Sequence, residues 1–256
     1  MTFDTIKLSH QKNYAIVQID NGKVNAINTP LLKDLKNVLE VLDRDEKVKG
    51  VMLAGRPKAF SAGLDIVSIA LMDEAQRFEF WVLYMNVLQA MIELSKPIVS
   101  AITGYAPAAA TILTLCTDYR VMAKGEKYVM GMHEFKLQMQ IPEMWCEIYA
   151  YHLGEVNAWK AVQQSRLFNS DEALAIGLVD ESVEVEAVVE RAEKHLLKLT
   201  QVYGKVFQYS KEIFRRGLHK IVVERDIEEL AKKQIAFNKD PFLAGMVKAF
   251  VATLKK

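Results

Sequence analysis

FSAGLDI, residues 60–66, is a loop of small residues that directly follows an expected strand. The apolar run VMLA, at 51–54, is succeeded by Gly55 and Pro57, as is typical of a buried strand that ends in a loop. The loop contains one acid, Asp65, but no promising nucleophile, metal-ligand cluster or phosphate-binding lysine–serine pair. Its backbone N–H groups are therefore candidates for the working atoms of a site.

On both sides of this loop, strand-like and helix-like segments alternate with short connections. Strands are expected at 6–8, 14–19, 50–54, 96–104 and 118–123, and helices at 29–43, 73–94 and 105–115. Thr29 is expected to cap the helix at 29–43, with Pro30 in its first position, and Pro107 to open the helix at 105–115. This alternation predicts an α/β core with parallel strands.

From Pro142 onward the pattern becomes helical. Helices are expected at 142–152, 154–165, 171–176, 186–199, 205–217, 221–237 and 241–255. No convincing strand lies among them, and only a brief extended segment follows Gly177. We therefore expect a core over residues 1–195 and an all-helical C-terminal region over residues 196–256, packed on the core or on a partner subunit.

Composition indicates an ordinary globular protein: 256 residues, 51% of them apolar, with a formal net charge of +1. Such a balance, without a basic stripe, argues against nucleic acid as a partner. Cys116 and Cys146 are expected to be buried thiols in a reducing compartment. The N-terminus does not resemble a signal peptide, and no apolar run reaches the roughly 18 residues of a membrane span. We therefore expect a cytoplasmic protein with no membrane partner.

Several segments together resemble the crotonase superfamily, the enoyl-CoA hydratases and isomerases. They are AFSAGLDI at 59–66, ITGYAPAAA at 102–110, CTDYR at 116–120, GMHE at 131–134 and SDEALAIGLVDESV at 170–183. The resemblance implies an α/β fold in which repeated ββα turns form a spiral, followed by a helical region that assists trimerisation and covers the active site. It also implies an acyl-CoA substrate from fatty acid metabolism, and assembly as a homotrimer or a dimer of trimers.

The same resemblance implies an oxyanion hole in which the N–H groups of Leu64 and Ala109 bind the thioester oxygen. Small residues allow close approach of the backbone, and a helix start presents free N–H groups. Most relatives carry glycines where this chain has Ala108, Ala109 and Ala110, and a lysine where it has Val67. Further substrate-binding residues implied in this way are Lys58, Ala62, Gly63, Asp65, Ile66 and Ala108, with Lys58 meeting the phosphates of CoA.

The acids favour isomerisation over hydration. Hydratases of the superfamily have two glutamates, and this chain matches one as Glu134 but has Ile112 at the other position. Hydration needs a base for water and an acid for carbon, whereas one carboxylate suffices to move a double bond from the 3- to the 2-position. Pro142, eight positions after Glu134, matches the single-glutamate isomerases. We therefore predict a Δ3,Δ2-enoyl-CoA isomerase with Glu134 as acid/base, no metal, and no cofactor apart from the CoA thioester of its substrate.

Two alternatives stay open. Glu143 at a helix start could be a second acid, which would give a hydratase, hydrolase or decarboxylase that uses Glu143 with Glu134. The alanine triplet is compatible with a non-catalytic acyl-CoA-binding homologue. Asp65 is expected to have a structural role and His133 to be polar surface. Met144 and Trp145 are candidates to line an acyl pocket.

Overall fold

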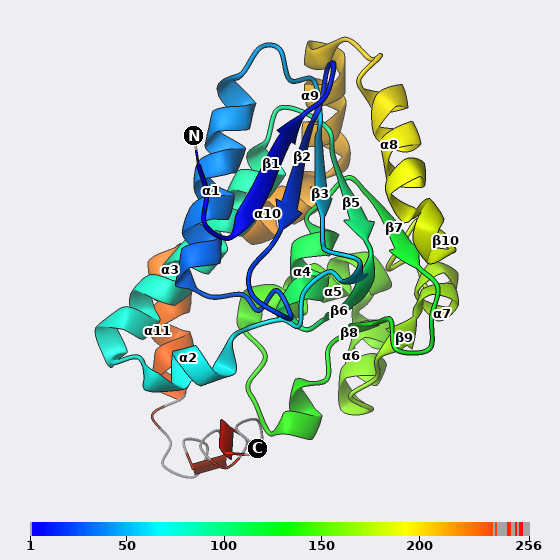
Figure 1. Ribbon diagram of the computed structural model, residues 1–256. Coiled ribbons are helices and arrows are strands. Elements are labelled where there is room, and N and C mark those ends of the chain that lie inside the picture. Colours follow the sequence, from blue (N-terminus) through cyan, green and yellow to red (C-terminus); the bar gives the residue numbers. More distant parts are fainter. Residues whose placement is uncertain (1, 238, 240–244, 247–248, 250, 253–256) are drawn as a thin grey trace.

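Two sheets form the centre of the computed structural model, which describes residues 2–237, 239, 245–246, 249 and 251–252 (Figure 1). The strands of the larger sheet are, in spatial order, β1 (Ile6–His10), β2 (Ala15–Ile19), β3 (Val51–Ala54), β5 (Ile98–Ile102), β7 (Tyr119–Ala123) and β10 (Glu181–Val183). The smaller sheet has the order β4 (Lys58–Ala59), β6 (Gly104–Pro107), β8 (Val129–Gly131) and β9 (Phe168–Asn169). All neighbours are parallel except the β1–β2 and β8–β9 pairs.

The chain crosses from the larger sheet to the smaller one three times, at β3–β4, β5–β6 and β7–β8. Each crossing is followed by helix: α2 (Ile66–Leu71) and α3 (Glu74–Glu93), then α4 (Ala109–Leu115), and then the 3-10 turn η1 (Glu134–Leu137) with α5 (Glu143–Leu153). This repetition confirms the predicted α/β fold of successive ββα turns. The strands β4, β6 and β8 of the smaller sheet are thus each followed, after a loop, by a helical element: α2, α4 and η1.

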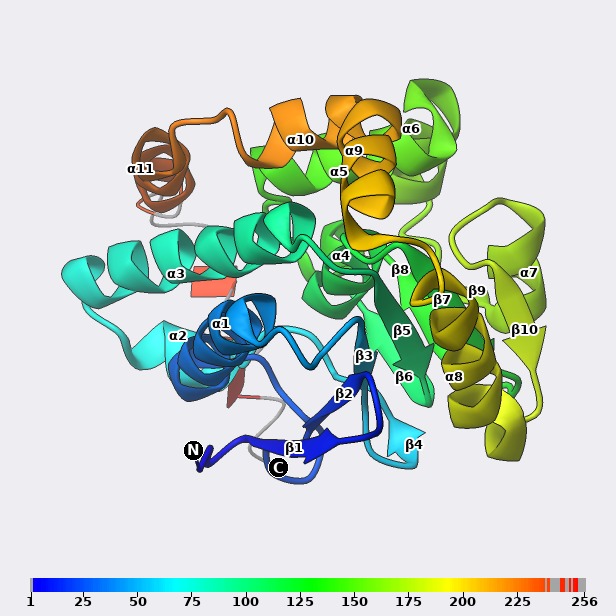
Figure 2. The same ribbon diagram turned by 90° about the horizontal axis from the view of Figure 1, so that it is seen from above.

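Helices cover both faces of the larger sheet, so its parallel strands are buried on both sides. α8 (Val188–Leu199) packs on one face, whereas α1 (Thr29–Arg44), α3 and α4 lie on the other side (Figure 2). Alternation along β5 explains this arrangement: Val99 and Ala101 contact the cluster of α8, while Ile98 and Ile102 belong to the core beneath α1 and α3. The predicted boundary between residues 195 and 196 falls within α8.

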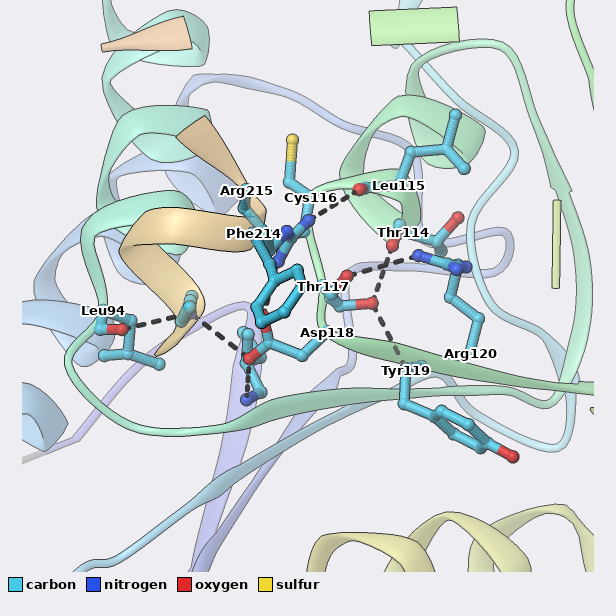
Figure 3. Close-up of polar contacts among 12 residues, drawn as sticks. Leu94, Thr114, Leu115, Cys116, Thr117, Asp118, Tyr119, Arg120, Phe214 and Arg215 are labelled. Atoms are coloured by element: carbon cyan, nitrogen blue, oxygen red, sulfur yellow. Dashed lines mark hydrogen bonds and ion pairs between the residues drawn. The ribbon is translucent and has the colours of Figure 1, made fainter. Parts of the chain in front are cut away.

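Up to residue 237, where the continuously described part of the chain ends, α8 is followed by α9 (Gly204–Phe214), α10 (Arg216–Val222) and α11 (Ile227–Phe237). A buried carboxylate, Asp118, fixes α9 to the core (Figure 3). Asp118 accepts hydrogen bonds from Lys211 Nζ at 3.2 Å, from Arg215, and from the backbone N–H of Ile98 at 2.9 Å. Burial lowers the pKa of Lys211, and Asp118 opposes this shift. Both cations also donate to carbonyl groups at helix ends: Lys211 to Leu94, and Arg215 to Leu115 and Cys116.

Several element boundaries differ from the predictions. Asn28, not Thr29, caps α1, because its side chain accepts the N–H of Leu31 at 3.1 Å. Pro107 ends strand β6 instead of opening a helix, and α4 starts two residues later. The C-terminal half does contain strands: β9 and β10 pair with β8 and β7 and separate α6 (Glu155–Gln163), α7 (Ser170–Ala175) and α8. Residues 221–222 belong to α10, and most of the helix predicted at 241–255 lies outside the described residues.

Both cysteines were predicted to be buried. Cys116 is buried, which confirms the prediction, but Cys146 is exposed, so the prediction was wrong for that residue. Within the described part of the chain, no helix has the length and apolarity required to cross a membrane.

Candidate active site

In the first loop, residues 60–66, the N–H of Leu64 points away from the neighbouring segment at Ile27. Ile27 forms a parallel bridge with Leu64: the Ile27 N–H donates to the Gly63 carbonyl at 2.8 Å, and the Asp65 N–H donates to the Ile27 carbonyl at 2.9 Å. In a parallel bridge the central residue directs its own N–H away from the partner. Gly63 makes the turn with φ of 84°, and Ser61 stabilises it by accepting the Gly63 N–H at 3.1 Å.

The second loop, which joins β6 to α4, contains a strained residue, Ala108, directly before the predicted N–H donor Ala109. Ala108 has φ of 56° and ψ of −123°, a backbone conformation that side-chain-bearing residues rarely adopt. The Ala108 N–H donates to the Gly131 carbonyl at 2.8 Å, which fixes the peptide. Ala109 is fully buried, and among the described residues neither its N–H nor that of Leu64 has a hydrogen-bond acceptor. Two free donors therefore lie at the two loops.

The two loops touch each other at Gly63. A Cβ atom added there would lie 3.1 Å from the carbonyl oxygen of Pro107 and 3.7 Å from the backbone nitrogen of Ala109. Any side chain at position 63 would thus press on the second loop, and its positive φ favours glycine as well. The structure therefore brings together the two segments whose N–H groups were predicted to form an oxyanion hole.

Glu134 lies beside the second loop, because β8 and β6 are parallel neighbours. Pro107 pairs with Gly131, so the residues that follow each strand emerge at the same edge of the smaller sheet. Glu134 is only 5% exposed, and neither of its carboxylate oxygens has a hydrogen-bond partner among the described residues. Burial raises the pKa of Glu134 from 4.5 to about 7. The backbone N–H groups of Glu134 and His133 lie near the carboxylate and offset part of this rise in pKa. Neither N–H has the geometry of a full hydrogen bond to the carboxylate.

Two buried hydroxyl groups that the sequence did not single out position these segments. Thr111 Oγ1 accepts the N–H of Gly131 at 2.7 Å and donates to the carbonyl of Ala106 at 2.7 Å, which joins β6 to β8. Tyr84 of α3 donates its hydroxyl to the carbonyl of Ala109 at 3.0 Å. Thr111 could have been found as a hydroxyl two residues after the predicted donor. The role of Tyr84 depends on packing between distant helices, for which the sequence contains no local signal.

The remaining predicted residues occupy different environments. Asp65 caps α2, since its side chain accepts the N–H of Ser68 at 3.0 Å, and Ile66 begins that helix. Ala62 and Lys58 are exposed, the latter with a φ of 71°. His133, expected at the surface, is instead half-buried; burial and the charge of Lys136 lower its pKa.

Glu143 is an exposed residue that forms ion pairs with Arg225 and, at 3.5 Å, with Lys233. Partial burial would raise the pKa of Glu143, but these two cations lower it below its ordinary value. Its carboxylate is thus already paired with cations, whereas that of Glu134 is not.

A cavity of about 620 Å³ opens next to Glu134, between η1, α5 and α6. Met132 and Phe135, on either side of the His133–Glu134 pair, contribute to its wall. Met144 and Trp145, predicted to line an acyl pocket, are instead buried outside this lining, and Trp145 packs edge-on against Trp81. From α5 the cavity is lined instead by Cys146, Tyr149 and Ala150.

With this geometry established, comparison with known proteins identifies the family. The profile of the family described as "Enoyl-CoA hydratase/isomerase" matches residues 9–255, so the chain belongs to that family. The chain is 32% identical over 204 residues to enoyl-CoA delta isomerase 1, mitochondrial, of Mus musculus, which covers 79% of this chain and 71% of the relative. It is 26% identical over 196 residues to crotonyl-CoA hydratase of Syntrophomonas wolfei, with 76% and 75% covered.

A solved structure supports the same assignment. The crystal structure of human mitochondrial delta3-delta2-enoyl-CoA isomerase superimposes with a TM-score of 0.92 at 25% identity and covers 98% of both chains. The predicted crotonase superfamily and its fold are thereby confirmed, and the protein is a member of a family of acyl-CoA enzymes.

Proposed function

We propose that the protein is an enoyl-CoA isomerase that moves a double bond from the 3- to the 2-position, with Glu134 as its single acid/base. The observation that carries the proposal is the environment of Glu134: a buried, unpaired carboxyl group with a pKa of about 7, beside two segments with free N–H donors. A base that titrates near neutral pH is well suited to remove and return a proton.

In the proposed reaction, the Glu134 carboxylate takes a proton from C2 of a 3-enoyl thioester. The electron pair of that C–H bond forms a double bond between C1 and C2, and the carbonyl π pair moves onto the thioester oxygen, which gives a dienolate with its negative charge on that oxygen. The N–H groups of Leu64 and Ala109 donate to this oxygen. Protonated Glu134 then returns the proton to C4, and the double bond forms between C2 and C3. Removal of one oxyanion donor typically costs about 3–4 kcal/mol in such a transition state.

The second carboxylate that hydration would require has no suitable candidate among the predicted residues. Ile112 is fully buried in the core, and Glu143 pairs with Arg225 and Lys233 at the surface. The names of the mouse and human relatives favour the same reaction. Lys58 is exposed and available for the phosphates of CoA. The mouse relative is named as mitochondrial, so the cytoplasmic location expected for this chain stays a prediction.

The test is a spectrophotometric assay with a trans-3-enoyl-CoA of medium chain length, in which the conjugated 2-enoyl thioester is detected by its absorbance. We expect turnover by the wild-type protein and a loss of about 10²- to 10⁴-fold in Glu134→Gln, with acyl-CoA binding retained. Glu143→Gln is the matched control and should keep most of the activity. An inactive wild type that still binds acyl-CoA, or an inactive Glu143→Gln, would contradict the proposal.

A further inference from the structure

Two hydrogen bonds hold the backbone on either side of the proposed donor at Ala109. Before it, the N–H of Ala108 donates to the carbonyl of Gly131 at 2.8 Å. After it, the carbonyl of Ala109 accepts the hydroxyl of Tyr84 at 3.0 Å. The peptide group that carries the Ala109 N–H lies between these bonds, and its own carbonyl accepts the N–H of Ile112 at 3.2 Å within α4. The direction of the Ala109 N–H therefore depends on how the first turn of α4 is held.

This turn follows a residue whose conformation alanine does not favour. Ala108 has φ of 56° and ψ of −123°, where its Cβ atom crowds the backbone, whereas glycine adopts such a conformation without that cost. A strained residue persists only where its surroundings fix it. Without an outside contact, the first turn of α4 would move to relieve Ala108, and the Ala109 N–H would turn with it.

Tyr84 supplies such a contact from a rigid position on α3. Its side chain is fully buried, and its ring packs against Trp81 and Trp145 with centroid distances of 6.1 and 5.4 Å. Burial raises the pKa of the Tyr84 hydroxyl well above its ordinary value, so the hydroxyl stays a proton donor. Among the described residues, Tyr84 alone makes a side-chain hydrogen bond to Ala109 itself.

We propose that Tyr84 is a positioning residue for the reaction: its hydroxyl holds the first turn of α4 against the strain at Ala108, so that the Ala109 N–H stays directed at the thioester oxygen. The inference rests on the proposed function, which assigns this N–H to the oxyanion. It makes the hydroxyl of Tyr84 and the side chain of residue 108 interdependent. If residue 108 were glycine, the restraint by Tyr84 would no longer be needed.

The test is a double-mutant cycle of Tyr84→Phe and Ala108→Gly, assayed with a trans-3-enoyl-CoA of medium chain length. Tyr84→Phe should lower kcat about tenfold with little change in KM, which is less than the roughly 10²- to 10³-fold cost of removing an oxyanion donor outright. In the Ala108→Gly background the same substitution should cost at most about twofold, because glycine needs no restraint there. A merely structural effect of the missing hydroxyl would give the same loss in both backgrounds.

A second measurement does not depend on turnover. A saturated acyl-CoA, isotope-labelled at its thioester carbonyl, is bound to each variant, and infrared difference spectroscopy records how far binding lowers the carbonyl stretching frequency. We expect a smaller lowering in Tyr84→Phe than in the wild type, and the wild-type value again in the double variant.

Tyr14→Phe is the matched control, because Tyr14 is a buried tyrosine whose hydroxyl donates to Glu193 at 2.7 Å, in the cluster beneath α8. It should lose similar stability in urea unfolding but keep kcat and the carbonyl shift. A wild-type kcat and carbonyl shift in Tyr84→Phe, or equal losses in both backgrounds, would overturn the inference and leave the proposed function intact. A wild type without isomerase activity would instead refute the proposed function, and the carbonyl shift would still decide whether Tyr84 positions the Ala109 N–H.

Discussion

At the scale of single residues, Glu134 is held in an environment that opposes its charge. An unpaired buried carboxylate destabilises the folded state, yet the proposed reaction requires that form. The conflict gives the residue two measurable properties, one in catalysis and one in stability. For catalysis, kcat/KM for isomerisation should rise with pH through about 7 and then level off, because the carboxylate is the base.

The stability of the fold should show the opposite dependence. The pKa of Glu134 is about 7 in the folded state and about 4.5 when unfolded, so the folded state binds the proton more tightly. Its contribution to stability is present below pH 4.5 and is lost as pH rises through 7. We expect Glu134→Gln to match the wild type near pH 4.5 and to exceed it by up to about 3 kcal/mol at pH 8, measured by urea unfolding.

Glu143→Gln serves as the control for this prediction. Its carboxylate is already paired with Arg225 and Lys233, so its removal should not stabilise the protein at any pH. If Glu134→Gln were no more stable than the wild type at pH 8, the carboxylate would have an unrecognised partner.

At the scale of elements, the attachment of α9 depends on one carboxylate. Asp118 (Figure 3) is the acceptor shared by Lys211 and Arg215. All three side chains are largely buried. Removing the acid would leave two buried cations without their counter-ion, whereas a surface pair is worth much less.

We expect Asp118→Asn to lower the free energy of unfolding by about 3–5 kcal/mol. Glu40→Gln, which breaks the exposed pair with Lys36 on α1, should cost about 0.3–0.5 kcal/mol. Denaturant unfolding of both variants would measure the difference. Equal effects would show that Asp118 does not hold α9 in place.

The long helices and most strands of the larger sheet were predictable, whereas a short strand of the smaller sheet was not. The stripe of Leu31, Leu35, Val38, Leu39 and Leu42 predicted α1, and Asp73 marked the start of α3. The strand β6, with the sequence GYAP, was missed because Gly104 and Pro107 usually indicate a turn. Its role becomes clear only in space: a Cβ atom at Gly104 would lie 2.2 Å from the backbone of Lys58, so glycine allows β4 to pair there.

At the scale of the whole molecule, three segments distant in the sequence form one candidate site. Motifs resembling the superfamily indicated Leu64, Ala109 and Glu134, and the paired ends of the smaller sheet's strands explain why these positions converge. The positioning role of Tyr84 could not be predicted, since its hydroxyl meets the carbonyl of Ala109 only once α3 and α4 are packed together.

One exposed helix face is a candidate for contact between copies of the chain. On α9, Val206, Tyr209 and Ile213 recur at three- and four-residue spacing and are all exposed, with Tyr209 at 66%. An apolar helix face of this kind is typical of an interface. We therefore propose that α9 contacts another subunit in a homotrimer or a dimer of trimers.

The wild-type protein should sediment at three or six times its subunit mass of 29.0 kDa. Tyr209→Lys should shift it toward the single subunit, because a buried lysine at an interface is costly. Val189→Lys, on the exposed face of α8, should leave the mass unchanged. A wild type that sediments as one subunit would refute this assembly.

The paired strands β6 and β8 have one further consequence, for hydrogen exchange with solvent. Ala108 and Ala109 are adjacent, yet the amide of Ala108 is bonded to Gly131 while that of Ala109 is buried without an acceptor. Exchange is slowed mainly by hydrogen bonding, so these neighbouring amides should differ sharply in protection, with that of Ala108 the slower to exchange. A bound thioester oxygen would supply the missing acceptor. The difference in exchange protection between the two amides would then shrink, so the exchange rate of the Ala109 amide would measure whether a thioester is bound.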